Sequence, residues 1–179
     1  MKFTLPAALG ALALLCPPAW ADFKPIDCGS TSFEMAEPGY NIDCERSTGT
    51  LRAGSATGGA TTDVMSVTSD DRTIFVTMVD HVITAQRIYL EHRGLRESFN
   101  DTFGDEDVRG WKNAASLNGY DVAEFSEKIS GQESRCITVQ RYANPAHIGF
   151  RRHVVGLGCT TGEIDKVYEI LKRIHAPGD

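Results

Sequence analysis

The residues in this chain that could support hydrolytic chemistry are its serines, its 5 histidines and its 24 acidic side chains. A serine hydrolase of the nucleophile-elbow type carries its serine in a G-x-S-x-G turn between a strand and a helix. The nearest pairs, Gly29-Ser30 and Gly54-Ser55, lack that context. The sequence therefore contains no hydrolase motif, although a triad can be assembled from residues that are distant in sequence.

Asp80, His81 and His92 are candidate metal ligands, because imidazole and carboxylate groups bind zinc and iron. Asp80 and His81 are adjacent at the predicted end of a strand, where successive side chains point to opposite faces. This alternation favours ordinary histidines over a metal centre. A small secreted hydrolase or metalloenzyme with a non-motif site around His81 or His92 is the alternative hypothesis.

Two other segments have compositions that resemble ligand loops. Asp101 to Asp107 is acidic but lacks the D-x-D-x-D-G spacing and the distal glutamate of a calcium loop, so we expect a solvated loop. Thr48 to Asp63 is rich in glycine and threonine but lacks the Gly-Lys-Ser/Thr ending of a phosphate-binding loop. We predict a mobile connection there. No cofactor is predicted, and no metal site is assigned.

A group of basic and aromatic residues is the clearest candidate for binding. Arginines on a rigid hairpin can bind an anionic ligand or the carboxylates of a partner protein, and a tyrosine beside a histidine adds a stacking surface. The alternative is that these side chains pair with local acids. The candidate binding residues are Arg141, Tyr142, Arg151, Arg152 and His153.

The N-terminal segment, residues 1–21, has the pattern of a secretory signal peptide. Lys2 precedes an apolar run, and Ala19-Trp20-Ala21 forms an A-x-A cleavage site. Lipid attachment at Cys16 is disfavoured, because bulky Leu15 precedes it. The sequence therefore predicts a periplasmic or secreted protein without a membrane span in the mature chain.

Four cysteines remain after that cleavage, and an even number in an exported chain favours disulfides. We predict the bridges Cys28–Cys44 and Cys136–Cys159. If 135–142 and 152–159 form a hairpin about the turn at 144–149, Cys136 lies opposite Cys159. The Cα separation in such a pair suits a disulfide. The same register places Tyr142 opposite His153.

Hydrophobic periodicity and turn residues predict the remaining elements. Asn118-Gly119 favours a two-residue turn that pairs Leu117 with Tyr120, Ala115 with Val122 and Trp111 with Ser126. Thr160 and Glu163 have capping-box spacing ahead of the final helix. The predicted strands are 32–35, 40–45, 64–68, 73–79, 114–117, 120–125, 135–142 and 152–159, and the predicted helices are 84–103, with a possible break at Gly94, and 164–174.

These elements predict an α+β fold: residues 22–179 form a single domain, mainly an antiparallel sheet of consecutive hairpins packed with two amphipathic helices. The order of elements, with the Asn118-Gly119 hairpin followed by two strands and the closing Ile164–Ile174 helix, resembles the α/β/α sandwich of PsbP-like and Mog1-like proteins. That resemblance implies an accessory or binding role rather than catalysis. The two predicted disulfides depart from the family pattern.

The formal net charge of the chain is −6, which excludes the basic footprint of a nucleic-acid-binding protein. With 41% hydrophobic residues the chain can form a packed core. The predicted function is an exported, disulfide-stabilised accessory or protein-binding module without catalytic activity. Its expected partner is another exported protein or an anionic ligand.

Overall fold

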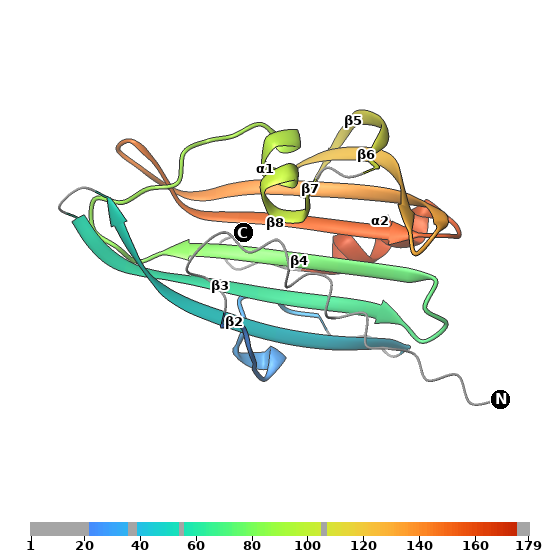
Figure 1. Cartoon of the computed structure of the whole chain (residues 1–179), viewed down its shortest axis with the longest axis horizontal. Coiled ribbons are helices and arrows are strands. Elements are labelled where there is room, and N and C mark those ends of the chain that lie inside the picture. The colour runs from blue at the N-terminus through green and yellow to red at the C-terminus, as the bar shows by residue number, and fades with distance from the viewer. Residues whose placement is uncertain (1–21, 36–38, 54–55, 105–106, 175–179) are drawn as a thin grey trace.

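The computed structural model describes residues 22–35, 39–53, 56–104 and 107–174. One antiparallel sheet of eight strands dominates the described chain, and two helices pack on it (Figure 1). The order across the sheet is β1-β2-β3-β4-β8-β7-β6-β5. The strands are β1 Lys24–Pro25, β2 Tyr40–Ala53, β3 Ala56–Ser69, β4 Ile74–Ile83, β5 Arg109–Leu117, β6 Tyr120–Ile129, β7 Gln132–Ala146 and β8 Gly149–Thr160, and the helices are α1 Leu95–Phe103 and α2 Ile164–Arg173.

The largest core lies between α2 and one face of the sheet. The helix turns its buried residues, including Val167 and Leu171, toward this face. The helix lies so close that a Cβ on Gly158 would be 2.4 Å from a Val167 methyl, so glycine is required there. We call this side the α2 face. Its strand residues include Met65, Val67, Val76, Met78, Val122, Ile137 and Val139.

The opposite side, the α1 face, carries a smaller and more aromatic core. Phe99 of α1 packs at 5.0 Å from the ring of Phe125, and Trp111 stacks on Phe125 at 5.5 Å. The Cys136–Cys159 disulfide belongs to the same cluster. Strands covered on both faces, such as β4 and β8, therefore carry apolar residues in runs rather than in strict alternation.

Both predicted disulfides and the register of the β7–β8 hairpin are confirmed. Cys136 lies opposite Cys159, with 4.1 Å between their Cα atoms, and Tyr142 lies opposite His153. The Cys28–Cys44 bridge attaches the N-terminal segment to β2.

The β5–β6 hairpin has the predicted turn, but its register is only partly as predicted. Leu117 pairs with Tyr120 across Asn118 and Gly119, both at positive φ. Beyond the turn, Val122 pairs with Ala114 rather than Ala115, and Ser126 pairs with Arg109 rather than Trp111. Two register shifts in β5 cause the difference, because each bulge displaces the pairing along one strand.

The prediction of a mobile loop over residues 48–63 is wrong, because these residues lie in β2 and β3 and pair across a tight hairpin; residues 54–55 lie outside the described chain. Threonine, which is common here, favours strands. Glycine here serves a close approach: a Cβ on Gly58 would lie 2.1 Å from the Cβ of Ala85. Composition alone did not distinguish that role from flexibility.

The predicted helix over 84–103 exists only from Leu95 onward, with Gly94 as its N-cap. Residues 84–94 instead cross the sheet end as an irregular segment with a turn at 85–87, and Leu90 exchanges two backbone hydrogen bonds with Phe150. Residues 32–35 contain only an isolated bridge instead of a strand. The capping box is also absent, since Thr160 ends β8 and its hydroxyl accepts from the Gly162 amide.

Within the described ranges, no helix combines the length and the hydropathy needed to cross a membrane. The predicted signal peptide, residues 1–21, lies outside the described residues.

Candidate functional site

The structure divides the five predicted binding residues between the two faces of the sheet. The face of each follows from strand alternation and cross-strand register. Arg141 and Arg152 belong to the α2 face, whereas Tyr142, Arg151 and His153 belong to the α1 face. The five side chains therefore do not converge on one surface, and a common binding role for them stays a prediction.

Arg152 is buried and forms a bidentate ion pair with Asp80. Its Nε and Nη2 atoms donate to the two carboxylate oxygens at 2.9 and 2.7 Å, and Asp80 is 1% exposed. The Ser32 hydroxyl also donates to Asp80. Such a buried pair fixes two charged groups in a water-poor site.

A second ion pair lies beside the first on the same face. Arg46 donates to both carboxylate oxygens of Asp63 at 2.6 and 2.7 Å, and the Ser32 amide donates to Asp63 at 3.1 Å. The hydrogen bonds that Arg46 donates to Asp63 raise the pKa of the Arg46 guanidinium. Because Asp63 pairs with Arg46 in β2 and Asp80 in β4, the four charges form one row, which we call the charge ladder.

Sequence reasoning missed the charge ladder. Its members, Arg46, Asp63, Asp80 and Arg152, come from four strands, and only the sheet order places them side by side. One weak signal was available in the sequence. Asp63 and Asp80 each lie two residues from a methionine, Met65 or Met78, that faces the core, so alternation places both carboxylates on the same buried face.

Arg141, the other arginine of the α2 face, lies over the ring of Tyr120 at 5.9 Å. Burial raises the pKa of the Tyr120 phenol, while Arg141 and Arg152 lower it. Arg141 therefore adds positive charge beside the charge ladder.

On the α1 face, side chains at the equivalent level of the sheet form an aromatic stack. His153 stacks on Tyr142 with 4.3 Å between ring centroids and 11° between planes, and His81 lies 6.3 Å beyond His153. His92 and Phe150 pack against Tyr142 at 4.9 and 5.0 Å. We call these five residues the aromatic stack.

Burial in the stack disfavours the charged forms of His153 and His81. Burial lowers the pKa of His153 to about 3, with further lowering by His81, Arg93 and His92. Burial also lowers the pKa of His81, against a smaller opposing effect of Asp80. The His81 Nδ1 atom lies 2.9 Å from the Thr62 hydroxyl.

The segment that precedes α1 is hydrogen-bonded to this face. The Tyr142 hydroxyl accepts from the Arg93 amide at 3.1 Å, and Gln140 Nε2 donates to the Arg93 carbonyl at 3.2 Å. Gln140 also donates to Asp121. These contacts make the stack a structural cluster that holds the crossing segment.

Of the two histidines considered for a hydrolytic site, His81 contacts the Thr62 hydroxyl and His92 packs against the ring of Tyr142. A hydrolytic or metal site around His81 or His92 stays a prediction. The described residues contain one group with metal-ligand proximity, Glu127 with Cys136 and Cys159. Those two sulfurs are joined in a disulfide and therefore cannot act as thiolate ligands.

The outer end of the β7–β8 hairpin, residues 144–151, carries exposed side chains, and we call it the hairpin tip. Ile148 is 70% exposed and His147 is exposed beside it. Arg151 is half-buried and lies over the ring of Tyr89 at 5.5 Å. The hairpin tip thus combines an apolar residue with a cation on a rigid element.

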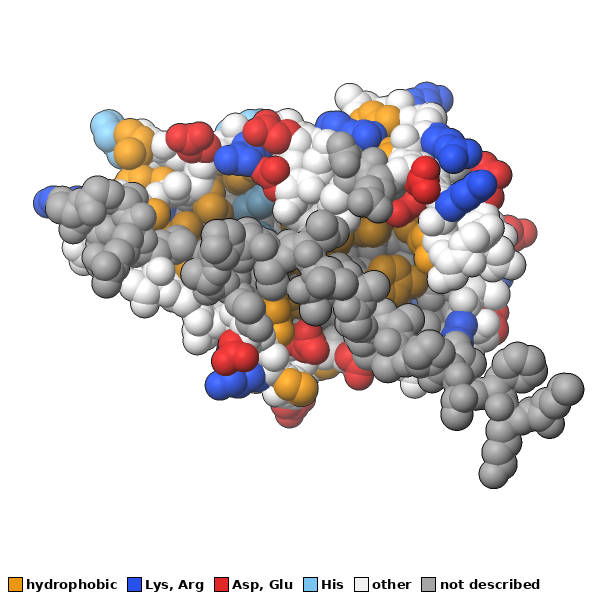
Figure 2. All heavy atoms as spheres, viewed as in Figure 1, with side chains coloured by type: hydrophobic (Ala, Val, Ile, Leu, Met, Phe, Trp, Pro, Cys, Tyr) orange, Lys and Arg blue, Asp and Glu red, His pale blue; other side chains and the backbone are white. Residues whose placement is uncertain are grey.

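On the face drawn in Figure 2, side chains of both charges lie close together. Figure 2 shows acidic and basic side chains interspersed along the rim formed by α1 and the β5–β6 hairpin. No broad field of one sign covers that rim, so recognition of an anion there would need a local arrangement of donors.

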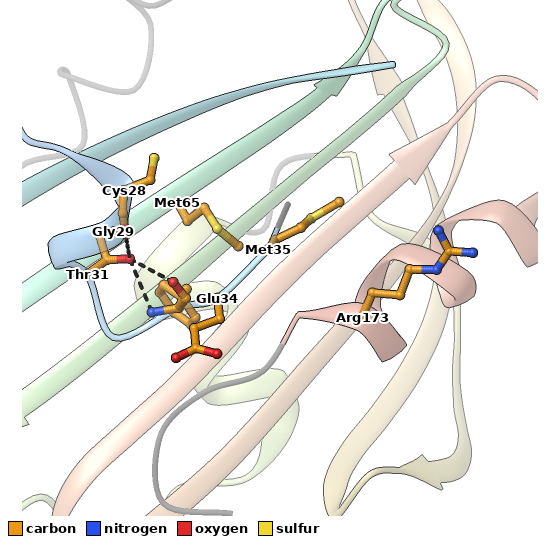
Figure 3. A pocket seen from close by; sticks show the side chains of 8 residues that line it. Cys28, Gly29, Thr31, Glu34, Met35, Met65 and Arg173 are labelled. Carbon is orange, nitrogen blue, oxygen red and sulfur yellow. Dashed lines mark hydrogen bonds between the residues drawn. The ribbon is translucent and has the colours of Figure 1, made fainter. Parts of the chain in front are cut away.

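A hollow of about 460 Å³ lies on the α2 face beneath the N-terminal segment. In Figure 3, Glu34 and Arg173 lie on opposite sides of it, with Met35 and Met65 between them. This hollow could not be predicted from the sequence, because its lining comes from segments that are distant in the chain. The lining residues are Cys28, Gly29, Thr31, Phe33, Glu34, Met35, Met65 and Arg173.

No family model matches this chain, and neither a curated protein nor a solved structure matches it. The functional argument therefore depends on the chemistry of the described residues.

Proposed function

We propose that this chain is an exported, disulfide-stabilised accessory module that binds another exported protein or an anionic ligand through the hairpin tip. The exposed Ile148 carries the proposal, together with Arg151 three residues further along the same end of the hairpin. A large exposed apolar residue on the same rigid hairpin end as an arginine is typical of the anchor of a protein interface. Binding there would involve Ile148, His147 and Arg151.

Two disulfides support a periplasmic or secreted location, because such bridges persist in oxidising compartments. They also support a rigid scaffold, since they hold the N-terminal segment and the β7–β8 hairpin. A binding module benefits from such rigidity, because less conformational entropy is lost on association.

We further propose that the fold is of the PsbP-like and Mog1-like type, in which accessory roles are common. The support is the layered arrangement, with α1 on one face of the sheet and α2 on the other. A solved relative with the same strand order would strengthen this relationship, and one with a different order would remove it.

The binding proposal is tested by cross-linking the mature chain to its partners in periplasmic extract. We expect Ile148→Asp with Arg151→Glu to lose the cross-linked partner at least tenfold, because both contacts are removed. Arg152 is left unchanged, since its ion pair with Asp80 supports the fold.

The matched control changes the opposite end of the sheet, where Ile129 is 38% exposed beside Lys128. We expect Ile129→Asp with Lys128→Glu to retain the partner. Equal loss in both double variants, or loss in neither, would count against the hairpin tip as the binding site.

A further inference from the structure

Among the described residues, no strand pairs with the outer edge of β2 beyond Arg46. β2 pairs with β3 from Tyr40 to Ala53 without a register shift. On its other side, β1 covers only Glu45 and Arg46, and Figure 1 shows the β2–β3 hairpin continuing past this short strand. The remaining part of β2 therefore forms the end of the sheet.

Backbone geometry shows which groups face outward at this edge. The Ile26 amide donates to the Cys44 carbonyl at 2.9 Å, so the polar groups of Cys44 point away from β3. Since these groups alternate along a strand, Thr48, Thr50 and Arg52 direct their N–H and C=O groups the same way. No backbone segment among the described residues pairs with Thr48 or Thr50 on this side.

The opposite edge of the sheet is protected and this one is not. β5 is interrupted by two register shifts and carries exposed Lys112, features that discourage strand addition. In β2, the segment from Ser47 to Leu51 contains no charged residue and no proline. A Cβ on Gly49 would meet nothing within 4 Å.

We propose that two copies of the mature chain pair through this edge, antiparallel and centred on Thr50, to form one continuous sheet. Centring on Thr50 places Thr50 opposite Thr50 and Thr48 opposite Arg52. Each residue whose backbone N–H and C=O groups point outward then lies opposite another such residue in the second copy, as antiparallel hydrogen bonding requires.

A second copy fits this edge for two reasons. The segment complements itself under two-fold rotation, the commonest symmetry of oligomers. The register also places Arg52, the charged residue that follows this segment, at the position opposite Thr48, so no two charged residues of like sign are paired. The paired segment is short, so the dimer is concentration-dependent. This proposal is independent of the function proposed for the hairpin tip.

The register is tested by cysteine cross-linking of the mature chain. Residues opposite each other in a hydrogen-bonded pair have Cα atoms about 5.5 Å apart, a distance that suits a disulfide. Thr50→Cys should therefore give a covalent dimer under mild oxidation. Thr48→Cys is the matched control and should stay monomeric, because its counterpart would lie about 13 Å away.

Sedimentation equilibrium tests the association itself. The wild-type chain and Thr50→Val should dimerise with rising concentration, since both keep the backbone N–H. Thr50→Pro removes that donor without touching the β2–β3 ladder and should weaken dimerisation at least tenfold. A monomeric wild-type chain, or cross-linking of Thr48→Cys as efficient as that of Thr50→Cys, would overturn the proposal.

Discussion

At neighbouring positions of β4 and β8, the two faces of the sheet accommodate buried polar side chains in opposite ways. Asp80 and Arg152 lie on the α2 face, and their immediate neighbours His81 and His153 lie on the α1 face. In the first pair, the arginine donates two hydrogen bonds to the carboxylate. In the second pair, burial disfavours the charged imidazoles, because it lowers both pKa values.

This difference shows that a buried polar pair on neighbouring strands can be accommodated either as an ion pair or as stacked imidazoles, depending on the residues that cover it. On the α2 face, Ser32 and a neighbouring ion pair supply further hydrogen bonds to the carboxylates. On the α1 face, aromatic rings cover the imidazoles and offer stacking in place of a counter-charge. The two faces should therefore respond differently to mutation and to pH.

Asp80→Asn should have the largest effect, because it leaves the buried Arg152 guanidinium without its counter-charge. Breaking a buried ion pair from one side costs about 3–5 kcal/mol in the free energy of unfolding. Urea denaturation monitored by tryptophan fluorescence measures this loss. The control is exposed Asp43→Asn, which should change stability by less than about 0.5 kcal/mol. A loss below about 1 kcal/mol for Asp80→Asn would show that the ladder is not a charged network.

Removal of the disulfide on each face should have the next effect. Cys28→Ala with Cys44→Ala should lower the free energy of unfolding by about 3 kcal/mol, because it releases the loop constraint. Cys136→Ala with Cys159→Ala should cost more, since both sulfurs pack in the cluster around Phe99. Urea denaturation compares the two variants, and an equal or reversed order would contradict the expected packing contribution of the α1 face.

Acid should destabilise the protein through the aromatic stack. The pKa of His153 is about 3 in the folded protein, against an ordinary value of 6.5. Between these values the unfolded chain binds the proton more readily, so stability falls as the pH is lowered from 6.5 toward 3. The slope is at most about 1.4 kcal/mol per pH unit for this histidine, or about 2 kcal/mol between pH 6.5 and 5.

His153→Phe keeps a ring on Tyr142 and should flatten this part of the stability–pH curve. The groups facing His153 are Tyr142, His81, His92 and Arg93, and all of them remain in the variant. Asp71 loses its contribution at lower pH, because its pKa is lowered to about 2 from 3.8. Parallel curves for wild type and His153→Phe between pH 6.5 and 5, from urea denaturation, would exclude His153 as the acid-sensitive group.

Much of the half of the sheet formed by β5, β6, β7 and β8 could be predicted from the sequence, because the residues that specify these strands are close together in the chain. Asn118-Gly119 specifies its own turn, and cysteine pairing sets the register of β7 against β8. The amphipathic pattern of α2 likewise predicted the face that it buries. The β5 bulges were missed because a bulge depends on neighbouring strands rather than on its own sequence.

The binding residues were predicted from proximity in sequence, and alternation along the strands then separated them. Arg151 and Arg152 are adjacent in sequence, yet one lies over Tyr89 near the surface and the other is buried against Asp80. The distinction needed the sheet order, since Asp80 reaches Arg152 only because β4 and β8 are neighbours.

The sequence by itself determined the two disulfides, the Asn118-Gly119 turn, the β7–β8 hairpin and the closing helix, because each depends on spacing or turn chemistry over short distances. Tertiary structure alone decided that residues 48–53 and 56–63 are strand, that 84–94 cross the sheet end, and that Asp63 and Asp80 bind arginines. Those outcomes depend on contacts between segments that are distant in the chain, because a strand needs a neighbouring strand and a buried carboxylate needs an arginine that another segment supplies. The open edge of β2 belongs with them, since an edge exists only once the order of the strands is fixed.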